Sequence, residues 1–241
     1  GGGPAATAAV TMGRLGLKTA YSGIVADDDF GGTMLELLNK EDIDTSSVII
    51  EPGARSQFAF IMVDRSTGKR TILWTRGTLP FIKPDQVDED LILSSKALLV
   101  DTLEPEAAAR AAGIASENEI LVVIDAGTLR DKVEEILPFC DYIVASETFA
   151  RQISNNETVI EALEKINSYG PKGAVVTLGE NGCAWLGSEG IFSEPGFNIN
   201  AVDTTGAGDV FHGAFLYGVL QGWDLRKICI FSNAVAGLKC R

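Results

Sequence analysis

Short apolar runs alternate with stretches of helical periodicity in the second part of the chain, and this alternation constrains the fold more than any other feature. Strands are expected at residues 97–101, 120–125, 142–145 and 174–178, and helices at residues 104–117, 130–137 and 157–169. Continuous apolar runs of this length are typical of parallel strands buried on both faces. Parallel strands joined by helices form an open sheet with helices on each side. The sequence therefore predicts an α/β fold with a doubly wound, mainly parallel sheet.

Residues 48–75 have an alternating rather than a helical periodicity. Two strands are expected at residues 56–64 and 70–75, joined by a glycine-containing loop at residues 65–69. A hairpin without a helix between its strands does not belong to a parallel core. We therefore expect a small separate sheet inserted into one α/β domain, with an edge hairpin of the main sheet as the alternative.

Length and charge favour a small-molecule partner for this chain. Its 241 residues suit one α/β domain with a small appendage, and its net charge of −13 argues against nucleic acid or an anionic membrane surface. The four cysteines lack CxxC or zinc-ligand spacing, so they are expected to be buried thiols in a reducing compartment. No apolar run is long enough for a membrane span and no leader is evident. We therefore expect the protein in the cytoplasm.

Both ends of the sequence are expected to be incomplete. The chain begins in a glycine run with no strand before it, and it ends inside a helical pattern. A sheet without a strand ahead of the first helix would expose an unpaired edge. We therefore expect the full-length protein to carry about 30 or more further residues, the scale of a βαβ unit.

The first structured segments are expected to be a strand at residues 18–25 and a helix at residues 33–40. Three adjacent aspartates at residues 27–29 stand between them. Such a cluster invites a metal site, but aspartates directly before a helix more often cap it. We therefore expect a capping role.

A glycine-rich turn at residues 202–211 joins a strand-like run at residues 197–201 to a helix. Gly206 and Gly208 allow a tight backbone path, and the first amides of the helix have no partner within it. Together with the helix dipole, these amides form a cradle for an anion. Asp209 lies in the first turn, so a carboxylate stands beside a site suited to developing negative charge. Phosphoryl transfer to a hydroxyl group requires this combination.

Either half of this turn has a purely structural alternative, because glycine-rich turns and first-turn aspartates are common. The whole string at residues 203–209, Asp-Thr-Thr-Gly-Ala-Gly-Asp, nevertheless resembles the signature Asp-Thr-x-Gly-Ala-Gly-Asp of the ribokinase-like (PfkB) family of sugar and nucleoside kinases. It matches at every specified position. The resemblance implies a ribokinase-like fold in which Asp209 is the catalytic base. It also places Gly206, Ala207 and Gly208 in the anion hole.

The start of the chain resembles the first signature of the same family, which is a glycine pair followed by a helix ending in Arg-Leu-Gly. A small-residue helix is expected at residues 5–16, with Gly16 as its stop. The resemblance implies that Gly2 and Gly3 approach the sugar, and that Thr7 stands where many members have a sugar-binding Asn. Spacing alone would favour a tightly packed helix after a flexible turn. The Thr leaves the identity of the substrate open.

The resemblance also makes residues 48–75 a β-sheet lid over the sugar, which in this family often forms the dimer contact. We expect four apolar side chains to share one face of the lid: Phe58, Phe60, Ile72 and Trp74. Their exposed area would be too large for a monomer. The sequence therefore predicts a homodimer formed through this stretch.

Two further segments resemble parts of the family's nucleotide site. Thr177, Gly179 and Gly182 match a Thr-x-Gly-x-x-Gly turn near the phosphate and ribose of ATP, and Asn233 begins a small-residue stretch that flanks the adenine in relatives. A hairpin turn and close helix packing are the alternatives. No Walker pattern is present, so a nucleotide site must be built another way.

Residues 146–149 stand where the family usually carries Asn-x-x-Glu, a pair linked to magnesium and phosphate. This chain has Ser146 and Phe149 at those two positions. Glu147 is the remaining candidate for contact with Mg²⁺, acting through water. Capping of the next helix by Ser146 and Glu147 is the alternative.

Four other polar residues attract attention. Asp101 and Asp125 fall at the carboxyl ends of strands, where open α/β sheets bind ligands. Asp125 with Arg130 resembles the family's Asp-x-x-x-x-Arg turn, and an ordinary ion pair is the alternative. His212 is the single histidine, and no motif places a nucleophile or a second histidine beside it. We expect it to pack or to face solvent rather than to take part in catalysis.

The sequence therefore predicts an ATP-dependent kinase that phosphorylates a hydroxymethyl group of a sugar or sugar derivative, with Mg²⁺ bridging the phosphates of ATP. Two alternatives stay open. One is a nucleoside kinase of the same family, and the other is a non-catalytic sugar or nucleotide sensor. Asp209 argues against the sensor, because a sensor needs no base.

Overall fold

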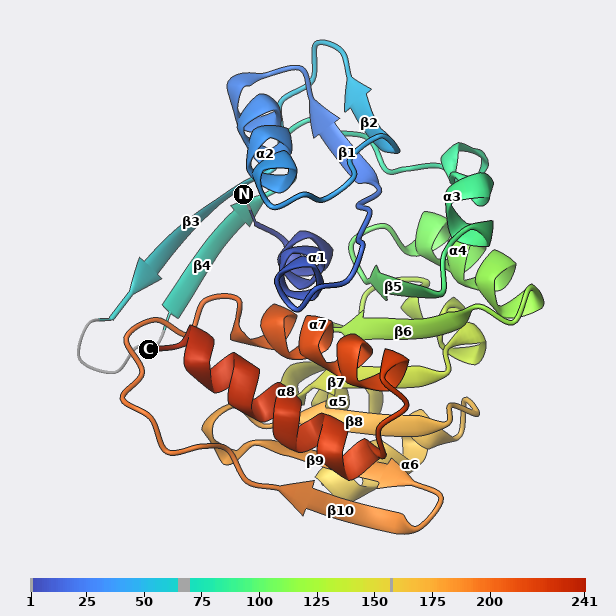
Figure 1. The fold of residues 1–241 in the computed structure, drawn as a ribbon, viewed down its shortest axis with the longest axis vertical. Coiled ribbons are helices and arrows are strands. Elements are labelled where there is room, and N and C mark those ends of the chain that lie inside the picture. Colours follow the sequence, from blue (N-terminus) through green and yellow to red (C-terminus); the bar gives the residue numbers. More distant parts are fainter. Residues whose placement is uncertain (1, 65–69, 157) are drawn as a thin grey trace.

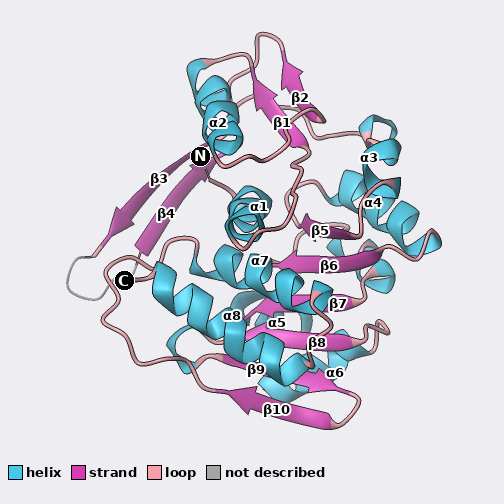
Figure 2. Cartoon of the chain, viewed as in Figure 1, coloured by secondary structure: helices cyan, strands magenta, loops and turns pink. Residues whose placement is uncertain are grey.

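A six-stranded sheet forms the centre of the molecule (Figures 1 and 2). The computed structural model describes residues 2–64, 70–156 and 158–241. The strand order is β10-β9-β8-β7-β6-β5, and β5 to β8 run parallel while β9 and β10 are antiparallel. The strands are β5 Ala97–Asp101, β6 Leu121–Ala126, β7 Tyr142–Ser146, β8 Gly173–Thr177, β9 Cys183–Gly187 and β10 Gly190–Glu194. The predicted doubly wound, mainly parallel sheet is confirmed.

Helices cover both faces of this sheet because its central strands are apolar on both sides. In β7, Ile143 and Ala145 join the core on one face, whereas Val144 joins the core on the other. Figure 1 shows three helices in front of the sheet, namely α1 Pro4–Arg14, α7 Ala207–Leu220 and α8 Leu225–Lys239. Three more lie behind it, namely α4 Pro105–Glu117, α5 Glu147–Ile153 and α6 Val159–Asn167.

The N-terminal part adds a second, two-stranded parallel sheet. It pairs β1 Gly23–Ala26 with β2 Val48–Glu51, and α2 Asp29–Lys40 connects the two strands. Asp28 is the N-cap of α2, since its Oδ1 accepts a hydrogen bond from the Gly31 amide at 2.9 Å. The predicted capping role is therefore confirmed for Asp28. The short helix α3 Glu89–Leu93 then leads into β5.

A separate antiparallel hairpin extends away from the main sheet (Figure 1). It consists of β3 Phe58–Val63 and β4 Arg70–Thr75, which confirms a small sheet apart from the core; the expected loop at residues 65–69 lies outside the described residues. The expectation of one shared apolar face is wrong. Phe60 pairs with Leu73 and Ile61 pairs with Ile72, and paired residues point to the same side. Phe58 and Phe60 therefore lie on one face, and Ile72 and Trp74 lie on the other.

Four of the expected elements differ from the observed ones. The strand expected at residues 18–25 is formed only from Gly23 onward, and before it Ala20 makes a single bridge with Asp44. The helix expected at residues 130–137 is replaced by two 3₁₀ turns, Val133–Glu135 and Leu137–Phe139. The second turn contains Pro138, which has no amide to donate in a helix interior.

The run at residues 197–201 is a loop, because no described strand pairs with it. Helix α6 starts later than expected, at Val159, where Thr158 caps it and forms a capping box with Glu161. Glu157, the expected start, lies outside the described residues. Within the described residues, no helix is both long and apolar enough to cross a membrane.

Candidate active site

The turn that opens α7 is the place where the sequence predicts an anion cradle. Gly206 is its N-cap residue with φ +75°, a left-handed conformation that favours glycine. The Ala207 amide donates to the Thr204 carbonyl at 3.2 Å, and the Val210 amide donates to the Gly206 carbonyl at 2.9 Å. The two amides between them, of Gly208 and Asp209, belong to the first helical turn and point toward the helix N-terminus, at the positive end of the dipole.

Helix α1 brings Thr7 beside this turn. A Cβ built on Gly206 would lie 3.5 Å from Cγ2 of Thr7 and 3.6 Å from Oδ2 of Asp209. Gly3 is the N-cap residue of α1 with φ +104°, and its carbonyl accepts from the Thr7 amide at 3.0 Å. Thr7 is thus one helical turn from the glycine pair. The structure brings the residues expected at the sugar and those expected at the phosphoryl group to one place.

The two helices also approach each other closely further along, at Gly213 of α7. A Cβ at Gly213 would lie 2.6 Å from the carbonyl oxygen of Ala8 and 2.8 Å from Cβ of Thr11. Only a residue without a side chain allows this approach. Gly213 therefore sets the spacing between α1 and α7.

Three carboxylates gather at the same edge of the sheet. Asp101 and Asp125 are register partners at the ends of β5 and β6, and both are influenced electrostatically by Asp209. Burial raises the pKa of the Asp101 carboxyl, although the amides of Leu103 and Ala5 donate to it at 2.8 and 3.3 Å and favour its ionised form. The expectation that strand-end aspartates lie where ligands bind in such sheets agrees with this arrangement.

Asp125 and His212 form a buried pair under the α7 turn. Nδ1 of His212 lies 3.2 Å from Oδ2 of Asp125, and the two side chains are 4% and 6% exposed. Burial raises the pKa of Asp125 to about 7; the imidazole opposes this rise, whereas the negative charges of Asp209 and Asp101 add to it.

Asp125 thus faces His212 rather than Arg130, which corrects the expected Asp125–Arg130 pair. The Arg130 guanidinium lies 5.9 Å from the ring centre of Trp74 in the hairpin. His212 packs as predicted, but the alternative that it faces solvent is wrong, since it is 3% exposed. Sequence reasoning missed its contact with Asp125. The available signal was its position four residues after Gly208, which places it one helical turn below the cradle.

The residues expected at the nucleotide form a second group. A turn at Gly179–Asn181 joins β8 to β9, with Gly182 at φ +86° and its carbonyl 2.7 Å from the Leu178 amide. A Cβ at Gly182 would lie 2.1 Å from the Glu194 carbonyl oxygen. Asn233 on α8 donates to that same carbonyl at 3.3 Å. Gly182 and Asn233 therefore meet at the end of β10.

Thr177, the other member of this group, is the last residue of β8. Its hydroxyl donates to the Ala145 carbonyl of β7 at 3.4 Å. Thr177 thus stands at the carboxyl edge of the sheet, the edge where Asp101 and Asp125 also lie.

Residues 146–149 begin helix α5. The Ser146 hydroxyl accepts from the Phe149 amide at 3.1 Å and donates to the Gly127 carbonyl at 2.7 Å, which confirms a helix cap. Phe149 is fully buried. Glu147 forms an exposed ion pair with Arg151 at 2.6 Å. Within the described part of the chain, no group of three or more His, Cys, Asp or Glu side chains is arranged to hold a metal ion.

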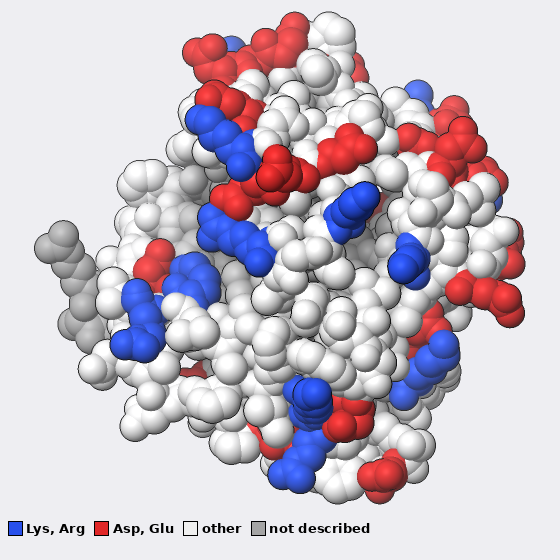
Figure 3. Space-filling view, viewed as in Figure 1, with Lys and Arg blue, Asp and Glu red and all other residues white. Residues whose placement is uncertain are grey.

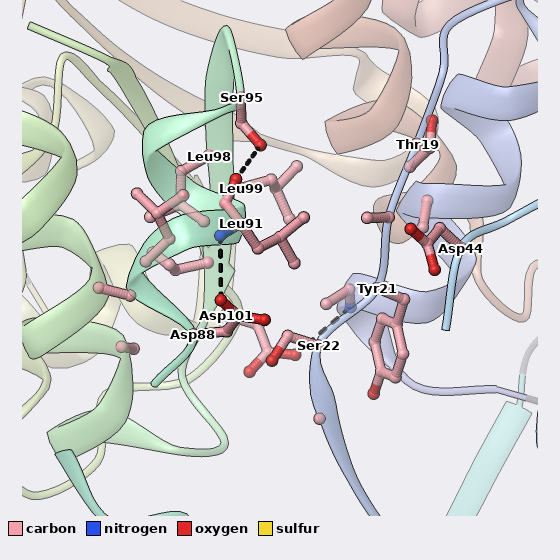
Figure 4. A pocket seen from close by; sticks show the side chains of 18 of the residues that line it. Thr19, Tyr21, Ser22, Asp44, Asp88, Leu91, Ser95, Leu98, Leu99 and Asp101 are labelled. Carbon is pink, nitrogen blue, oxygen red and sulfur yellow. Dashed lines mark hydrogen bonds between the residues drawn. The ribbon is translucent and has the colours of Figure 1, made fainter. Parts of the chain in front are cut away.

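A cavity of about 920 Å³ lies between α1, β1, α4 and β5. Figure 4 shows Tyr21 and Asp44 on one side of it, and Leu98, Leu99 and Asp101 on the other. Each of β1 and β5 pairs with one described strand only, and the cavity follows their remaining edges. Burial, and then the nearby Asp101, raise the pKa of Tyr21. Asp101 lines this cavity, so the cavity borders the group formed by Asp101, Asp125 and Asp209.

Charge is mixed on the face of the molecule seen in Figure 3. Lysine and arginine side chains lie scattered among acidic ones there, and no continuous basic patch forms on this face. The acidic excess of the whole sequence, −13, agrees with this picture.

Comparisons with known proteins identify the family to which the chain belongs. The family described as "pfkB family carbohydrate kinase" matches residues 1–241. "Probable fructokinase-2" of Arabidopsis thaliana is 30% identical over 98% of this chain and 80% of its own length, and ribokinase of Haemophilus influenzae is 28% identical over 98% and 80%. The crystal structure of ribokinase from Thermotoga maritima has a TM-score of 0.87 at 28% identity, over 99% of this chain and 80% of that one.

Proposed function

Because the chain belongs to the pfkB family of carbohydrate kinases, we propose that it transfers the γ-phosphoryl group of ATP to a hydroxymethyl group of a sugar or sugar derivative. That it is an ATP-dependent sugar kinase follows from the family. One observation carries the finer proposal. The α7 turn sets the Asp209 carboxylate beside a helix N-terminus and next to Thr7 of α1.

In the proposed reaction, the sugar hydroxyl oxygen attacks the γ-phosphorus while the bond from that phosphorus to the bridging oxygen of ADP breaks. The hydroxyl proton passes to the Asp209 carboxylate. The amides of Gly208 and Asp209 stabilise the charge on the transferring group. The amide of Ala207 donates to Thr204 within the turn, so Ala207 and Gly206 contribute by shaping the backbone of the anion hole.

We assign the sugar to the N-terminal end of α1. Gly2 and Gly3 give the sugar close backbone approach, and Thr7 lies beside the α7 turn with its Cγ2 methyl group toward Gly206. We assign ATP to the second group, with Thr177, Gly179 and Gly182 toward phosphate and ribose and Asn233 toward the adenine. The hydrogen bonds of Asn233 to the end of β10 give it a positioning role in that wall.

Mg²⁺ fits this site as an ion held mainly by ATP. Magnesium usually keeps several waters and takes one or two protein carboxylates together with substrate phosphates. Glu147 is the candidate carboxylate, and its ion pair with Arg151 would have to break before it could contact the ion. When bound, the ion neutralises phosphate charge, while the proton transfer and the orientation of the sugar remain with Asp209 and α1.

The test of this function is ADP release over a panel of sugars, with ribose, fructose and a deoxygluconate derivative in one arm and nucleosides in the other. We expect ATP- and Mg²⁺-dependent turnover with at least one sugar and much lower kcat/KM with every nucleoside. Turnover with nucleosides alone would identify the family's other substrate class instead. Binding of a sugar without any ADP release would favour the sensor.

We further propose that the protein forms a homodimer through the hairpin. Its two faces both carry exposed apolar side chains, with Phe60 54%, Leu73 59% and Ile72 47% exposed. Both faces also approach the main body, since Trp74 lies near Arg130 and Phe58 packs against Phe30 of α2. We assign the second copy to the face with Phe60 and Leu73, because these side chains are more exposed than Ile72 and Trp74 on the other face.

Light scattering at micromolar concentration checks this prediction. We expect the mass of a dimer, reduced to that of a monomer by Phe60→Glu. Ile72→Glu introduces the same charge on the other face and should leave the dimer intact. A monomeric wild type, or dissociation by Ile72→Glu alone, would contradict the assignment.

All four cysteines are buried and free. This supports the proposal that the enzyme works in the cytoplasm, where thiols stay reduced. Sugar and ATP are the partners that we propose, with no role for nucleic acid or membrane.

A further inference from the structure

The His212 ring is surrounded by hydrogen-bond acceptors. Nδ1 lies 2.6 Å from the carbonyl oxygen of Gly208, and Nε2 lies 3.1 Å from the carbonyl oxygen of Val144 on β7. The Asp125 carboxylate is the third neighbour, at 3.2 Å from Nδ1. These contacts join α7 to two strands of the main sheet, just below the proposed phosphoryl site.

The shortest of these contacts fixes a proton on the ring. A nitrogen lone pair 2.6 Å from a carbonyl oxygen would repel it, so Nδ1 carries a proton and donates to Gly208. Oδ2 of Asp125 is buried and makes no hydrogen bond with any described residue. Its contact with the ring is therefore electrostatic. An oxygen 3.2 Å from Nδ1 favours the tautomer that carries its proton on that nitrogen.

The carbonyl that receives this bond belongs to the peptide that joins Gly208 to Asp209. The N–H of that peptide is the Asp209 amide, which points the opposite way, toward the anion. A hydrogen bond to the carbonyl polarises the peptide and makes its N–H a stronger donor. It also fixes the plane of a peptide that follows a glycine, where the backbone has more freedom than elsewhere.

We propose that His212 and Asp125 are positioning residues of the transfer reaction. Asp125 holds the His212 ring in its Nδ1–H form, and that N–H holds the Gly208–Asp209 peptide so that its amide points at the transferring phosphoryl group. Neither side chain touches the substrate. This role rests on the proposed function, because it requires the α7 turn to be the anion hole.

The pair His212→Asn and His212→Gln tests the proposal. The amide nitrogen of Asn stands about as far along the side chain as Nδ1 of His, whereas that of Gln stands about as far as Nε2. Removal of one anion-hole donor costs about 10² to 10³ in kcat, and a donor that is loosened rather than removed should cost less. We expect His212→Gln to lower kcat by about 10- to 100-fold with little change in the KM for sugar. His212→Asn should recover most of that loss.

A purely structural role would give the reverse order. Gln fills the space of the ring better than Asn, so thermal melting should then favour Gln, with kcat per folded enzyme unchanged in both variants. Equal kcat in the two variants and the wild type would overturn the proposal. A kcat ranking of Gln above Asn would overturn it as well.

A spectroscopic measurement on the unaltered enzyme gives an independent answer. His212 is the only histidine, so the imidazole nitrogen signals of ¹⁵N-histidine-labelled protein belong to it without further assignment. We expect Nδ1 to carry a directly bonded proton at the assay pH, and Asp125→Asn to weaken that signal and lower kcat by about 10-fold. An Nδ1 without a proton would overturn the proposal. Two outcomes separate this proposal from the proposed function. If Asp209→Asn loses activity but His212→Gln keeps it, only the positioning role is refuted. If Asp209→Asn keeps full activity, the proposed function itself is refuted.

Discussion

We expect replacement of Asp209 by Asn to lower kcat by about 10² to 10⁴, the usual worth of a positioned general base. The substitution keeps the size of the side chain and most of its hydrogen bonding, but it removes the charge and the proton acceptor. Sugar and ATP should therefore bind nearly as before. A loss in kcat with KM almost unchanged identifies an interaction that is made mainly in the transition state. Steady-state kinetics with the best sugar of the panel, beside thermal melting, measure this.

Asp224→Asn is the matched control. Asp224 is the N-cap of α8, where its carboxylate accepts from the Lys227 amide at 2.9 Å. Asn caps a helix about as well as Asp, so we expect kcat to stay at the wild-type value and stability to change by less than about 1 kcal/mol. Near-wild-type kcat in folded Asp209→Asn would end the catalytic assignment and favour a sensor.

The sheet and the α7 turn were predictable from sequence because each is encoded by neighbouring residues. A run such as Val122–Val123–Ile124 is apolar on both faces and admits only a buried strand. The order Gly206, Gly208, Asp209 specifies a turn into a helix by its own backbone chemistry. Local patterns of this kind predict the final structure because the tertiary contacts stabilise the same conformation that the local sequence favours.

The remaining features depend on contacts between distant segments. The face that Phe60 or Ile72 occupies follows from the register of β3 on β4, which hydrophobic periodicity leaves open. The partner of Asp125 is His212 rather than nearby Arg130, because α7 lies across the end of β6. In both cases, tertiary packing decided between local alternatives. The expected helix at residues 130–137 is different, because Pro138 just beyond its end was a local signal against it.

Replacement of Gly213 by Ala should damage stability and activity together. Its Cβ would come within 2.6 Å of the Ala8 carbonyl oxygen, in a backbone contact that no side-chain rotation can relieve. Helix α1 must then move away from α7. Overpacking of this kind costs about 1 to 3 kcal/mol of unfolding free energy. Because α1 carries Gly3 and Thr7 while α7 carries Asp209, the move also separates the proposed sugar site from the base.

A shift of several tenths of an ångström between reacting groups is large on the scale of catalysis, where 1 Å can cost about 10²-fold. We therefore expect kcat/KM for the sugar to fall by about 10- to 100-fold in Gly213→Ala, with ATP affinity little changed, since Gly182 and Asn233 lie at the end of β10. Kinetics with each substrate varied in turn, together with chemical denaturation, measure both effects.

Gly113→Ala in α4 is the matched control, because its Cβ would meet only Phe139 at 3.9 Å. In a helix interior with room for the methyl group, Ala is favoured over Gly by about 1 kcal/mol. If Gly213→Ala were also stabilised, or kept full kcat/KM, the close approach of α1 and α7 would have no part in assembling the site.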